Sequence, residues 1–312
     1  MGNINVALLG EKGYGKEIGK KGTESDITFY NLKKGNDTVT MVEPFGYPDK
    51  LSSLFHSISL ADFAIFVVSD IDAYLGEQLI AVASAGIEKG VFILKNYHTP
   101  DEIKPLIRDM PFENYQFFED DPIKIREFLL EMAGSRKSTE AENGSVVIDH
   151  FFNVKGVGAV VLGTVVSGSI RKHDDLDLLP LKRKVHVRSI QKHDDDYDIA
   201  SKGDRVGLAL KNVESDELRR GDVLTSEKLI SADEIEIKLL KNRYWKKEIR
   251  EGMILHIGNW MQFVPARVKN VEKEKLTLSA DRPLIFNESS RFFMSHLDSG
   301  IPRVIGSGFI IQ

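Results

Sequence analysis

The apolar pattern of the chain changes at one segment, residues 135–145, and this change constrains the fold more than any other feature. The segment reads Ser-Arg-Lys-Ser-Thr-Glu-Ala-Glu-Asn-Gly-Ser and contains no large apolar residue, as is typical of a linker. Before it, continuous apolar runs alternate with segments of helical spacing, which predicts an α/β domain with a parallel sheet. After it, runs rich in Val and Ile are separated by Gly and Asp turns about every ten residues, which predicts β-barrels.

The chain of 312 residues is long enough for two or three domains. We predict four consecutive parts: an α/β domain over residues 1–134, a linker over 135–145, a β-barrel over 146–228 and a second β-barrel over 229–312. The α/β domain is expected to end with a helix over Ile123–Met132, because Asp121 is a suitable N-cap and a proline follows it.

The composition excludes several classes of protein. The sequence has no cysteine, which excludes disulfide partners, thiolate metal sites and a cysteine nucleophile. Its longest apolar runs, such as Ala64–Val68, fall far short of the roughly 20 residues that span a membrane, so we expect no membrane partner. No signal peptide is visible before the first strand-like run, so we expect a cytoplasmic protein. The net charge of −5 argues against a uniformly basic surface but permits a local basic face for nucleic acid.

A glycine-rich loop follows the first predicted strand, Asn3–Leu9, and carries the clearest chemical signal. The P-loop pattern requires Gly, four residues, Gly-Lys and then Ser or Thr, and Gly10, Gly15 and Lys16 match it. In such a loop, backbone amides close around phosphate oxygens, and a helix that begins at Lys16–Lys21 adds a favourable field. We therefore predict a nucleotide site made of Gly10, Glu11, Lys12, Gly13, Tyr14, Gly15, Lys16 and Glu17.

Glu17 stands where the P-loop pattern has the hydroxyl that ligates Mg²⁺. Its carboxylate either binds the ion directly or weakens Mg²⁺-dependent binding, because it adds negative charge beside the phosphates. The alternative for the whole motif is a glycine-rich strand–helix turn that binds no ligand. The strand–loop–helix context favours the phosphate site.

Five segments after the linker are very similar to the second domain of translational GTPases, and most similar to the EF-Tu/SelB branch. They are residues 146–168, 178–180, 185–191, 203–208 and 220–224. The resemblance implies the fold class of the whole chain, which is an α/β P-loop GTPase-like domain followed by two β-barrel domains. It also implies GTP or GDP as the cofactor. The resemblance is weaker over residues 230–312.

The hydrolysis elements of that family are altered in the first domain. The family's Asp-x-x-Gly element falls at Glu43–Gly46, which keeps Gly46 for the γ-phosphate and replaces the Mg²⁺-associated Asp by Glu43. Tyr47 stands at the position of the catalytic His, and a phenol offers no equivalent reach or polarity for positioning water. The first switch region is shortened, and Thr23 is preferred over Ser25 as the source of its hydroxyl.

The guanine-reading Asn-Lys-x-Asp element of the family falls at Lys95-Asn96-Tyr97-His98. His98 replaces the carboxylate that accepts from the guanine edge, so guanine selectivity is left open, while Asn96 is kept as a predicted nucleotide-binding residue. The candidate metal ligands that the resemblance implies are Glu17, Thr23 and Glu43, and the use of Mg²⁺ is left open. Together these differences imply that phosphate binding is mostly retained and that hydrolysis is slow or absent.

In the EF-Tu/SelB family, the first two domains enclose the aminoacyl end of tRNA. The resemblance places Asp149 and Phe151 on one strand of this pocket and His193 and Arg205 on the opposite wall. An imidazole and a guanidinium there donate hydrogen bonds to the esterified residue. The alternatives are a surface ion pair for Arg205 and a solvated turn for His193.

The sequence leaves two functions open. The first is an elongation factor-like GTP-binding protein that carries a specialised aminoacyl-tRNA to the ribosome. The short first domain is most similar to archaeal EF-Tu-like paralogues of methanogens, which include the candidate pyrrolysine-specific factor EF-Pyl, and the cations of Lys241–Lys247 suggest tRNA contacts unless Trp245 is simply buried in a β-turn. The second is a non-catalytic pseudo-GTPase scaffold or regulator that binds RNA or a protein partner.

Overall fold

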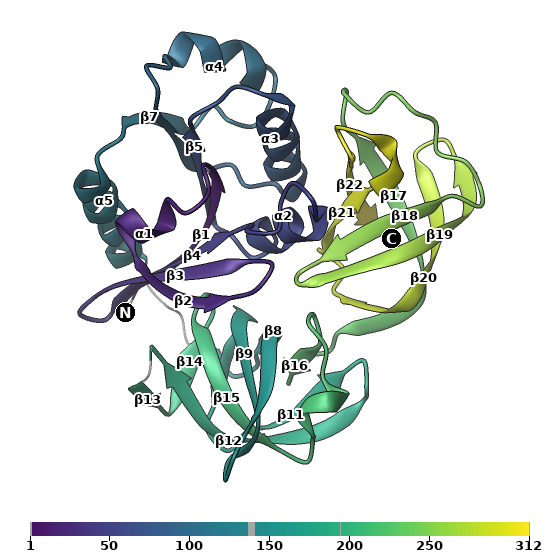
Figure 1. Cartoon of the computed structure of the whole chain (residues 1–312). Coiled ribbons are helices and arrows are strands. Elements are labelled where there is room, and N and C mark those ends of the chain that lie inside the picture. The colour runs from purple at the N-terminus through teal and green to yellow at the C-terminus, as the bar shows by residue number, and fades with distance from the viewer. Residues whose placement is uncertain (1, 137–140, 194, 312) are drawn as a thin grey trace.

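The computed structural model describes residues 2–136, 141–193 and 195–311. Figure 1 shows an N-terminal α/β domain (domain 1, β1–α5) that rests on two β domains, a middle one (domain 2, β8–β16) and a C-terminal one (domain 3, β17–β22). Residues 137–140 of the predicted linker lie outside the described residues. This arrangement confirms the predicted fold class of an α/β domain followed by two β-barrels.

Domain 1 is built on a seven-stranded sheet of order β2-β3-β4-β1-β5-β6-β7, in which β1 runs parallel to both β4 and β5. Its strands are β1 (Asn3–Gly10), β2 (Lys20–Glu24), β3 (Thr28–Lys34), β4 (Asp37–Glu43), β5 (Phe63–Val68), β6 (Gly90–Leu94) and β7 (Tyr115–Glu119). Its helices are α1 (Gly15–Ile18), α2 (Leu51–Ile58), α3 (Ala73–Ala85), α4 (Pro100–Ile107) and α5 (Pro122–Ser135). Every residue of β5 is buried, as expected for a central strand covered by helices on both faces. The Asp121 side chain caps α5, as predicted, by accepting from the backbone amides of Ile123 and Lys124.

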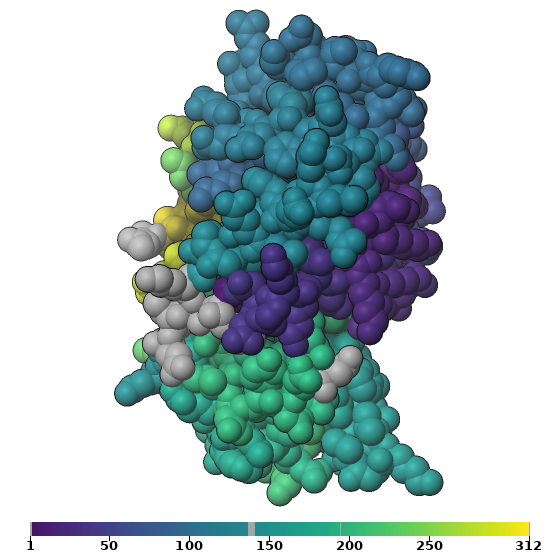
Figure 2. Space-filling view, turned by 90° about the vertical axis from the view of Figure 1, so that its left-hand side faces the viewer, coloured from purple at the N-terminus to yellow at the C-terminus, as the bar shows by residue number. Residues whose placement is uncertain are grey.

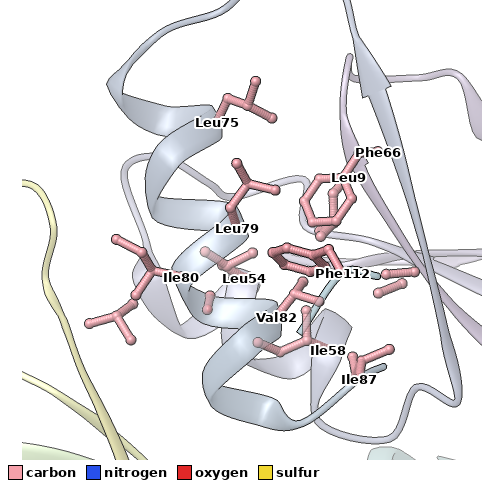
Figure 3. Close-up of a cluster of buried hydrophobic side chains, with 14 of the residues drawn as sticks. Leu9, Leu54, Ile58, Phe66, Leu75, Leu79, Ile80, Val82, Ile87 and Phe112 are labelled. Atoms are coloured by element: carbon pink, nitrogen blue, oxygen red, sulfur yellow. The ribbon is translucent and has the colours of Figure 1, made fainter. Parts of the chain in front are cut away.

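The core of domain 1 continues into domain 3. Figure 3 shows Leu75, Leu79 and Val82 of α3 pointing toward Phe66 and Phe112, in the body of domain 1, whereas Ile80 points to the other side of the helix. The same apolar cluster includes Phe293 and Val304 of domain 3. A helix with apolar residues on two sides buries both of them, so α3 joins the two domains.

The helix that we predicted to begin at Lys16–Lys21 is shorter than expected, so the prediction of its extent was wrong. Helix α1 ends after a single turn at Ile18, Gly19 is extended, and Lys20–Glu24 forms the edge strand β2, which pairs antiparallel with β3. The physical reason is local. Gly19 and Gly22 disfavour a helix, and the polar sequence Lys-Lys-Gly-Thr-Glu supplies no apolar face with which a longer helix could pack.

Domains 2 and 3 are both barrels. In domain 2, six strands of the order β11-β16-β8-β9-β15-β12 close through a β11–β12 pairing, and domain 3 is a closed barrel of the order β17-β20-β19-β18-β21-β22. The strands of domain 2 are β8 (Ser145–Val154), β9 (Gly158–Ser167), β10 (Ser169–Arg171), β11 (Asp175–Leu179), β12 (Arg183–Lys192), β13 (Asp195–Tyr197), β14 (Ile199–Ser201), β15 (Arg205–Lys211) and β16 (Val223–Thr225), with the 3₁₀ turn η1 (Ser215–Glu217). The strands of domain 3 are β17 (Ile230–Lys241), β18 (Ile254–Asn259), β19 (Gln262–Glu272), β20 (Lys275–Phe286), β21 (Arg291–Ser295) and β22 (Val304–Ile310), with the 3₁₀ turn η2 (Leu297–Ser299).

The domains are joined by direct contacts. The Asn3 side chain of β1 donates to Asp204 of domain 2 at 2.8 Å, and the Ser307 hydroxyl of domain 3 donates to the backbone carbonyl of Ser84 in α3 at 2.6 Å. In the space-filling view of Figure 2, the purple and blue surface of domain 1 lies directly against the green surface of domain 2. Within the described residues, no helix has both the length and the apolar character that crossing a bilayer requires.

Candidate functional site

The glycine-rich loop leaves β1 at Gly10 and has the tight backbone that only glycine accepts easily. Gly10 and Gly13 have φ angles of +87° and +85°, in the left-handed region. A Cβ at Gly10 would lie 2.0 Å from the carbonyl oxygen of Val67. The loop therefore requires glycine at Gly10 for space as well as for conformation.

Glu43, at the end of β4, places its carboxylate on this loop. Glu43 is buried, its Oε1 accepts from the Gly13 amide, and its Oε2 accepts from the Tyr30 hydroxyl at 2.9 Å. Burial and the neighbouring Glu43 carboxylate raise the pKa of Tyr30. Backbone amides of such loops are the groups that bind phosphate oxygens, so an anionic side chain of the protein itself already uses the Gly13 amide. A phosphate reaches that amide only after Glu43 has moved.

The other residues expected at the phosphates are also engaged elsewhere. The amide of Gly46 donates to the backbone carbonyl of Asp26 at 2.7 Å. Lys12 is exposed and places its ammonium 5.7 Å from the ring centre of Phe45. Lys16 is exposed and lines a cavity between domains 1 and 2.

The segment aligned with the guanine-reading element makes contacts inside domain 1. Lys95 donates to the Glu11 carboxylate of the glycine loop at 2.9 Å, and this hydrogen bond raises the pKa of Lys95. The Asn96 side chain donates to a backbone carbonyl of the loop after β5 at 3.0 Å. The His98 imidazole lies 3.4 Å from the Glu102 carboxylate. The Lys95–Glu11 contact shows that the loop and this segment are adjacent, as a nucleotide site requires, while Asn96 and His98 bind other groups of domain 1.

Tyr47 lies in the interface between domains 1 and 3. Its hydroxyl donates to the Glu77 carboxylate of α3 at 3.0 Å, and burial together with Glu77 raises the pKa of Tyr47. Glu77 is fully buried and also accepts from Arg303 of domain 3, whose Nη2 lies 2.6 Å from Oε2 and whose backbone amide lies 2.6 Å from Oε1. Tyr47, which was expected at the catalytic His position, is therefore hydrogen-bonded within domain 1 to the carboxylate that binds Arg303 of domain 3.

The three candidate metal ligands lie in two places. Glu17 and Thr23 both line the cavity between domains 1 and 2, whereas Glu43 lies on the glycine loop. Within the described part of the chain, no group of three or more His, Asp or Glu side chains is placed to hold a metal ion.

A polar cluster on domain 2 contains two of the predicted aminoacyl-pocket residues. Asp149 on β8 is buried and accepts from Arg205 on β15, at 2.8 Å from Nη2 and 3.3 Å from Nε. His150 places Nδ1 2.5 Å from Asp149 and Nε2 3.1 Å from the Ser25 hydroxyl of domain 1. Burial alone raises the pKa of Asp149, but Arg205 and His150 outweigh it and hold that pKa below its usual value.

Domain 1 covers this cluster with an aromatic ring. The guanidinium of Arg205 lies 3.6 Å from the ring centre of Phe29 on β3, and the His150 ring meets Phe29 edge-on at 5.9 Å. His193 lines the same interdomain cavity as Arg205. Phe151 packs against the hydrophobic core of the barrel instead. The structure thus brings Asp149, Arg205 and His193 to one region and uses Phe151 for packing.

Sequence analysis missed a second interdomain cluster. Asp26, just before β3, accepts from Arg220 of domain 2 at 2.7 Å and lies 3.6 Å from His56 of α2. All three residues line a cavity of about 790 Å³ at the junction of the three domains. Burial raises the pKa of Asp26, but the hydrogen bonds from His56 and Arg220 outweigh it and lower that pKa below its ordinary value. Burial lowers the pKa of His56.

These shifts predict a loss of stability in mild acid. A histidine whose pKa is lowered by folding disfavours protonation in the folded state, so its contribution is complete above the unfolded pKa of about 6.5 and is lost as the pH falls below it. Replacing His56 by Gln should therefore reduce the fall in Tm between pH 7.5 and pH 5.5. Burial raises the pKa of Asp222 to about 6, so its titration raises the stability as the pH falls, opposite to the effect of His56. Because Asp222 is present in both proteins, the difference between the variant and the wild type reports His56 alone. Thermal melts of both proteins across this range make the measurement, and parallel curves would show that His56 is not the titrating group.

For the segment Lys241–Lys247, which was predicted to contact tRNA, the structure fits the alternative of a turn around a buried Trp245. Trp245 is buried in the core of domain 3. Arg243 binds the Asp109 carboxylate of domain 1 at 2.9 Å. The segment is therefore a turn with a buried tryptophan that also contacts domain 1.

Comparisons with known proteins agree on one group. Residues 158–225 match the family described as elongation factor Tu domain 2. The protein MJ0325 of Methanocaldococcus jannaschii, which carries the name "uncharacterized protein", is 38% identical over 311 residues, and the match covers 99% of each chain. The selenocysteine-specific elongation factor of the same organism is 28% identical over 92% of this chain and 70% of its own length.

Solved structures agree on the fold. The translation elongation factor SelB of Methanococcus maripaludis, in complex with the GTP analogue GppNHp, superimposes with a TM-score of 0.83 at 22% identity. The match covers 100% of this chain and 79% of that one. The bacterial selenocysteine-specific factor EF-Sec gives a TM-score of 0.82 at 16% identity, over 99% of this chain and 58% of its own.

Proposed function

Because this chain belongs to the EF-Tu/SelB branch of translational GTPases, in one family with MJ0325, we propose that it carries a specialised aminoacyl-tRNA. We propose further that it binds GTP or GDP weakly and does not hydrolyse GTP efficiently. The observation that carries the proposal is the buried Asp149–Arg205 pair with His150 on domain 2, which residues 25–29 of domain 1 cover.

The cluster suits the ester end of a charged tRNA. Arg205 and His150 are hydrogen-bond donors held in fixed positions by Asp149, and charge-assisted donors in a partly buried cleft bind carbonyl and anionic groups strongly. Ser25 ends the segment that resembles the family's first switch region, and Phe29 follows it on β3, so a movement of this segment would uncover the pocket. This geometry supports a carrier in which domain 1 opens and closes over the cargo.

The cargo is a specialised amino acid. A factor for all amino acids depends on rapid hydrolysis at each step, and the residue expected at the catalytic His position, Tyr47, is hydrogen-bonded to Glu77 beside the contact with domain 3. Two of the relatives are named selenocysteine-specific elongation factors, which makes selenocysteine the first candidate. The resemblance to archaeal paralogues adds pyrrolysine as the second candidate. The Arg205 and His150 donors suit a small anionic selenolate better than a long neutral side chain.

The test is a comparison of charged and uncharged tRNA. Wild-type protein should slow spontaneous hydrolysis of the ester in selenocysteinyl-tRNA or pyrrolysyl-tRNA and should bind the charged form at least tenfold more tightly in gel shifts. Arg205→Lys, which keeps a charge beside Asp149, should lose most of this preference. The matched control is Arg188→Met, which alters an exposed arginine of the same domain. Equal binding of charged and uncharged tRNA would reject the aminoacyl pocket and leave the scaffold function.

A further inference from the structure

A cavity of about 730 Å³ lies between domains 1 and 2, away from the Glu43 carboxylate on the glycine loop. It exists because α1 stops after one turn and the chain returns as β2 along the edge of the sheet. Figure 1 shows β2 and β3 on the side of domain 1 that faces domain 2, and residues of β9, β12 and β15 line the cavity from domain 2.

The lining of this cavity is strongly basic. Among the described residues that line it, six are Lys or Arg (Lys16, Lys20, Lys21, Lys33, Arg126 and Arg205) and one, Glu17, is a carboxylate. A protein of net charge −5 has therefore concentrated positive charge at one concave place. Concave sites lined by one sign of charge attract and retain ligands of the opposite sign.

Three of these six cations have no carboxylate partner among the residues that the structure describes. Lys21 pairs with Glu24, Lys33 with Asp195 at 2.9 Å, and Arg205 with Asp149 at 2.8 Å. Within the described residues, no carboxylate lies within salt-bridge distance of the remaining three, which are Lys16, Lys20 and Arg126. They come from α1, β2 and α5, so three separate elements direct free positive charge to one cavity.

The uncharged residues of the lining indicate which kind of anion fits the cavity. Asn31, Gln191 and Thr23 offer hydrogen bonds, and Leu32, Leu162 and Val206 complete the wall, while no Phe, Tyr or Trp is among the lining residues. Single-stranded nucleic acid sites normally carry aromatic rings on which bases stack. With His193 as the one aromatic ring among its described lining residues, the cavity suits phosphate groups better than stacked bases.

We propose that this cavity binds an oligophosphate anion of about two to three phosphates, the chemistry shared by inorganic tripolyphosphate and the phosphate chain of a nucleoside triphosphate. The site shares Lys16 and Glu17 with the end of the glycine-rich segment and Arg205 with the Asp149 cluster, whereas Gly10–Gly13 and Asp149 are not among its lining residues. Because Lys16, Lys20 and Arg126 belong to domain 1 and Gln191 and Arg205 to domain 2, the bound anion also bridges the two domains.

Isothermal titration with sodium tripolyphosphate at low salt tests the proposal. Wild-type protein should bind it, and the Kd should rise with added NaCl because the contact is electrostatic. The double variant Lys20→Gln, Arg126→Gln should raise the Kd about tenfold. The matched control Lys228→Gln, Lys269→Gln removes two exposed positive charges elsewhere and should leave the Kd within about twofold.

Further arms separate the sources of the anion. GTP and ATP that compete equally with tripolyphosphate identify the phosphate chain of a nucleotide, and no competition identifies a free oligophosphate. Absence of binding by the wild type, an equal effect of both double variants, or at least tenfold tighter binding of a 12-nucleotide RNA would each overturn the proposal, the last in favour of an RNA-backbone surface.

Discussion

Replacing Glu43 by Ala should tighten the binding of GTP and GDP at least tenfold. In the structure, the Glu43 carboxylate accepts from the Gly13 amide, the group that a phosphate oxygen requires. The substitution removes this internal competitor and also a negative charge that repels phosphates. A tenfold change in Kd corresponds to about 1.4 kcal/mol, which is within the range of one charge-assisted hydrogen bond.

Titration of a fluorescent GDP analogue, with and without Mg²⁺, measures the effect. The control is Glu24→Ala, which removes an exposed carboxylate of β2 that lies outside the loop. The Glu43 variant should also be less stable by about 1–3 kcal/mol, because the Tyr30 hydroxyl loses its buried acceptor. If affinity is unchanged while the protein remains folded, the Gly13 amide does not bind phosphate and the nucleotide part of the proposed function is wrong.

Much of the architecture could be predicted because it depends on local patterns. The continuous apolar run Phe63–Val68 is typical of a strand buried on both faces, and all of its residues are buried in β5. The Val- and Ile-rich runs after the linker form the predicted barrels. The extent of α1 was not predicted, because a glycine-rich loop followed by Lys and Glu permits a helix, and only the free edge of β3 decides for a strand.

The positions of the site residues depend on long-range register, which a single sequence does not reveal. Parallel pairing of β1 with β4 sets Ala7 opposite Val42 and so brings Glu43 beside the glycine loop. His150 was missed for a related reason. Neighbouring residues on a strand point to opposite faces, so His150 was not expected beside Asp149, but a bulge between Ile148 and His150 shifts the register and lets both side chains meet Ser25 and Arg205 at the domain boundary.

Replacing Arg303 by Met should have the largest effect on stability in the chain. Glu77 is fully buried and accepts from both the guanidinium and the backbone amide of Arg303, although the two residues are 226 positions apart. Removal of the guanidinium leaves a buried carboxylate without its counter-charge, and breaking such a pair costs about 3–5 kcal/mol. The control Arg250→Met removes an exposed arginine of the same domain and should change stability by less than about 1 kcal/mol.

Urea unfolding measures the free energies of unfolding of Arg303→Met and its control Arg250→Met. A double variant then separates the effect of the unpaired charge from the effect of lost packing. In Glu77→Leu, Arg303→Met both charges are absent, so most of the loss should be recovered, as is common when a buried ion pair is replaced by apolar residues. The Tyr47 hydroxyl retains the backbone carbonyl of Tyr74, at 3.1 Å, as an acceptor. A single variant as stable as the wild type would show that the Glu77–Arg303 pair does not hold domain 1 to domain 3.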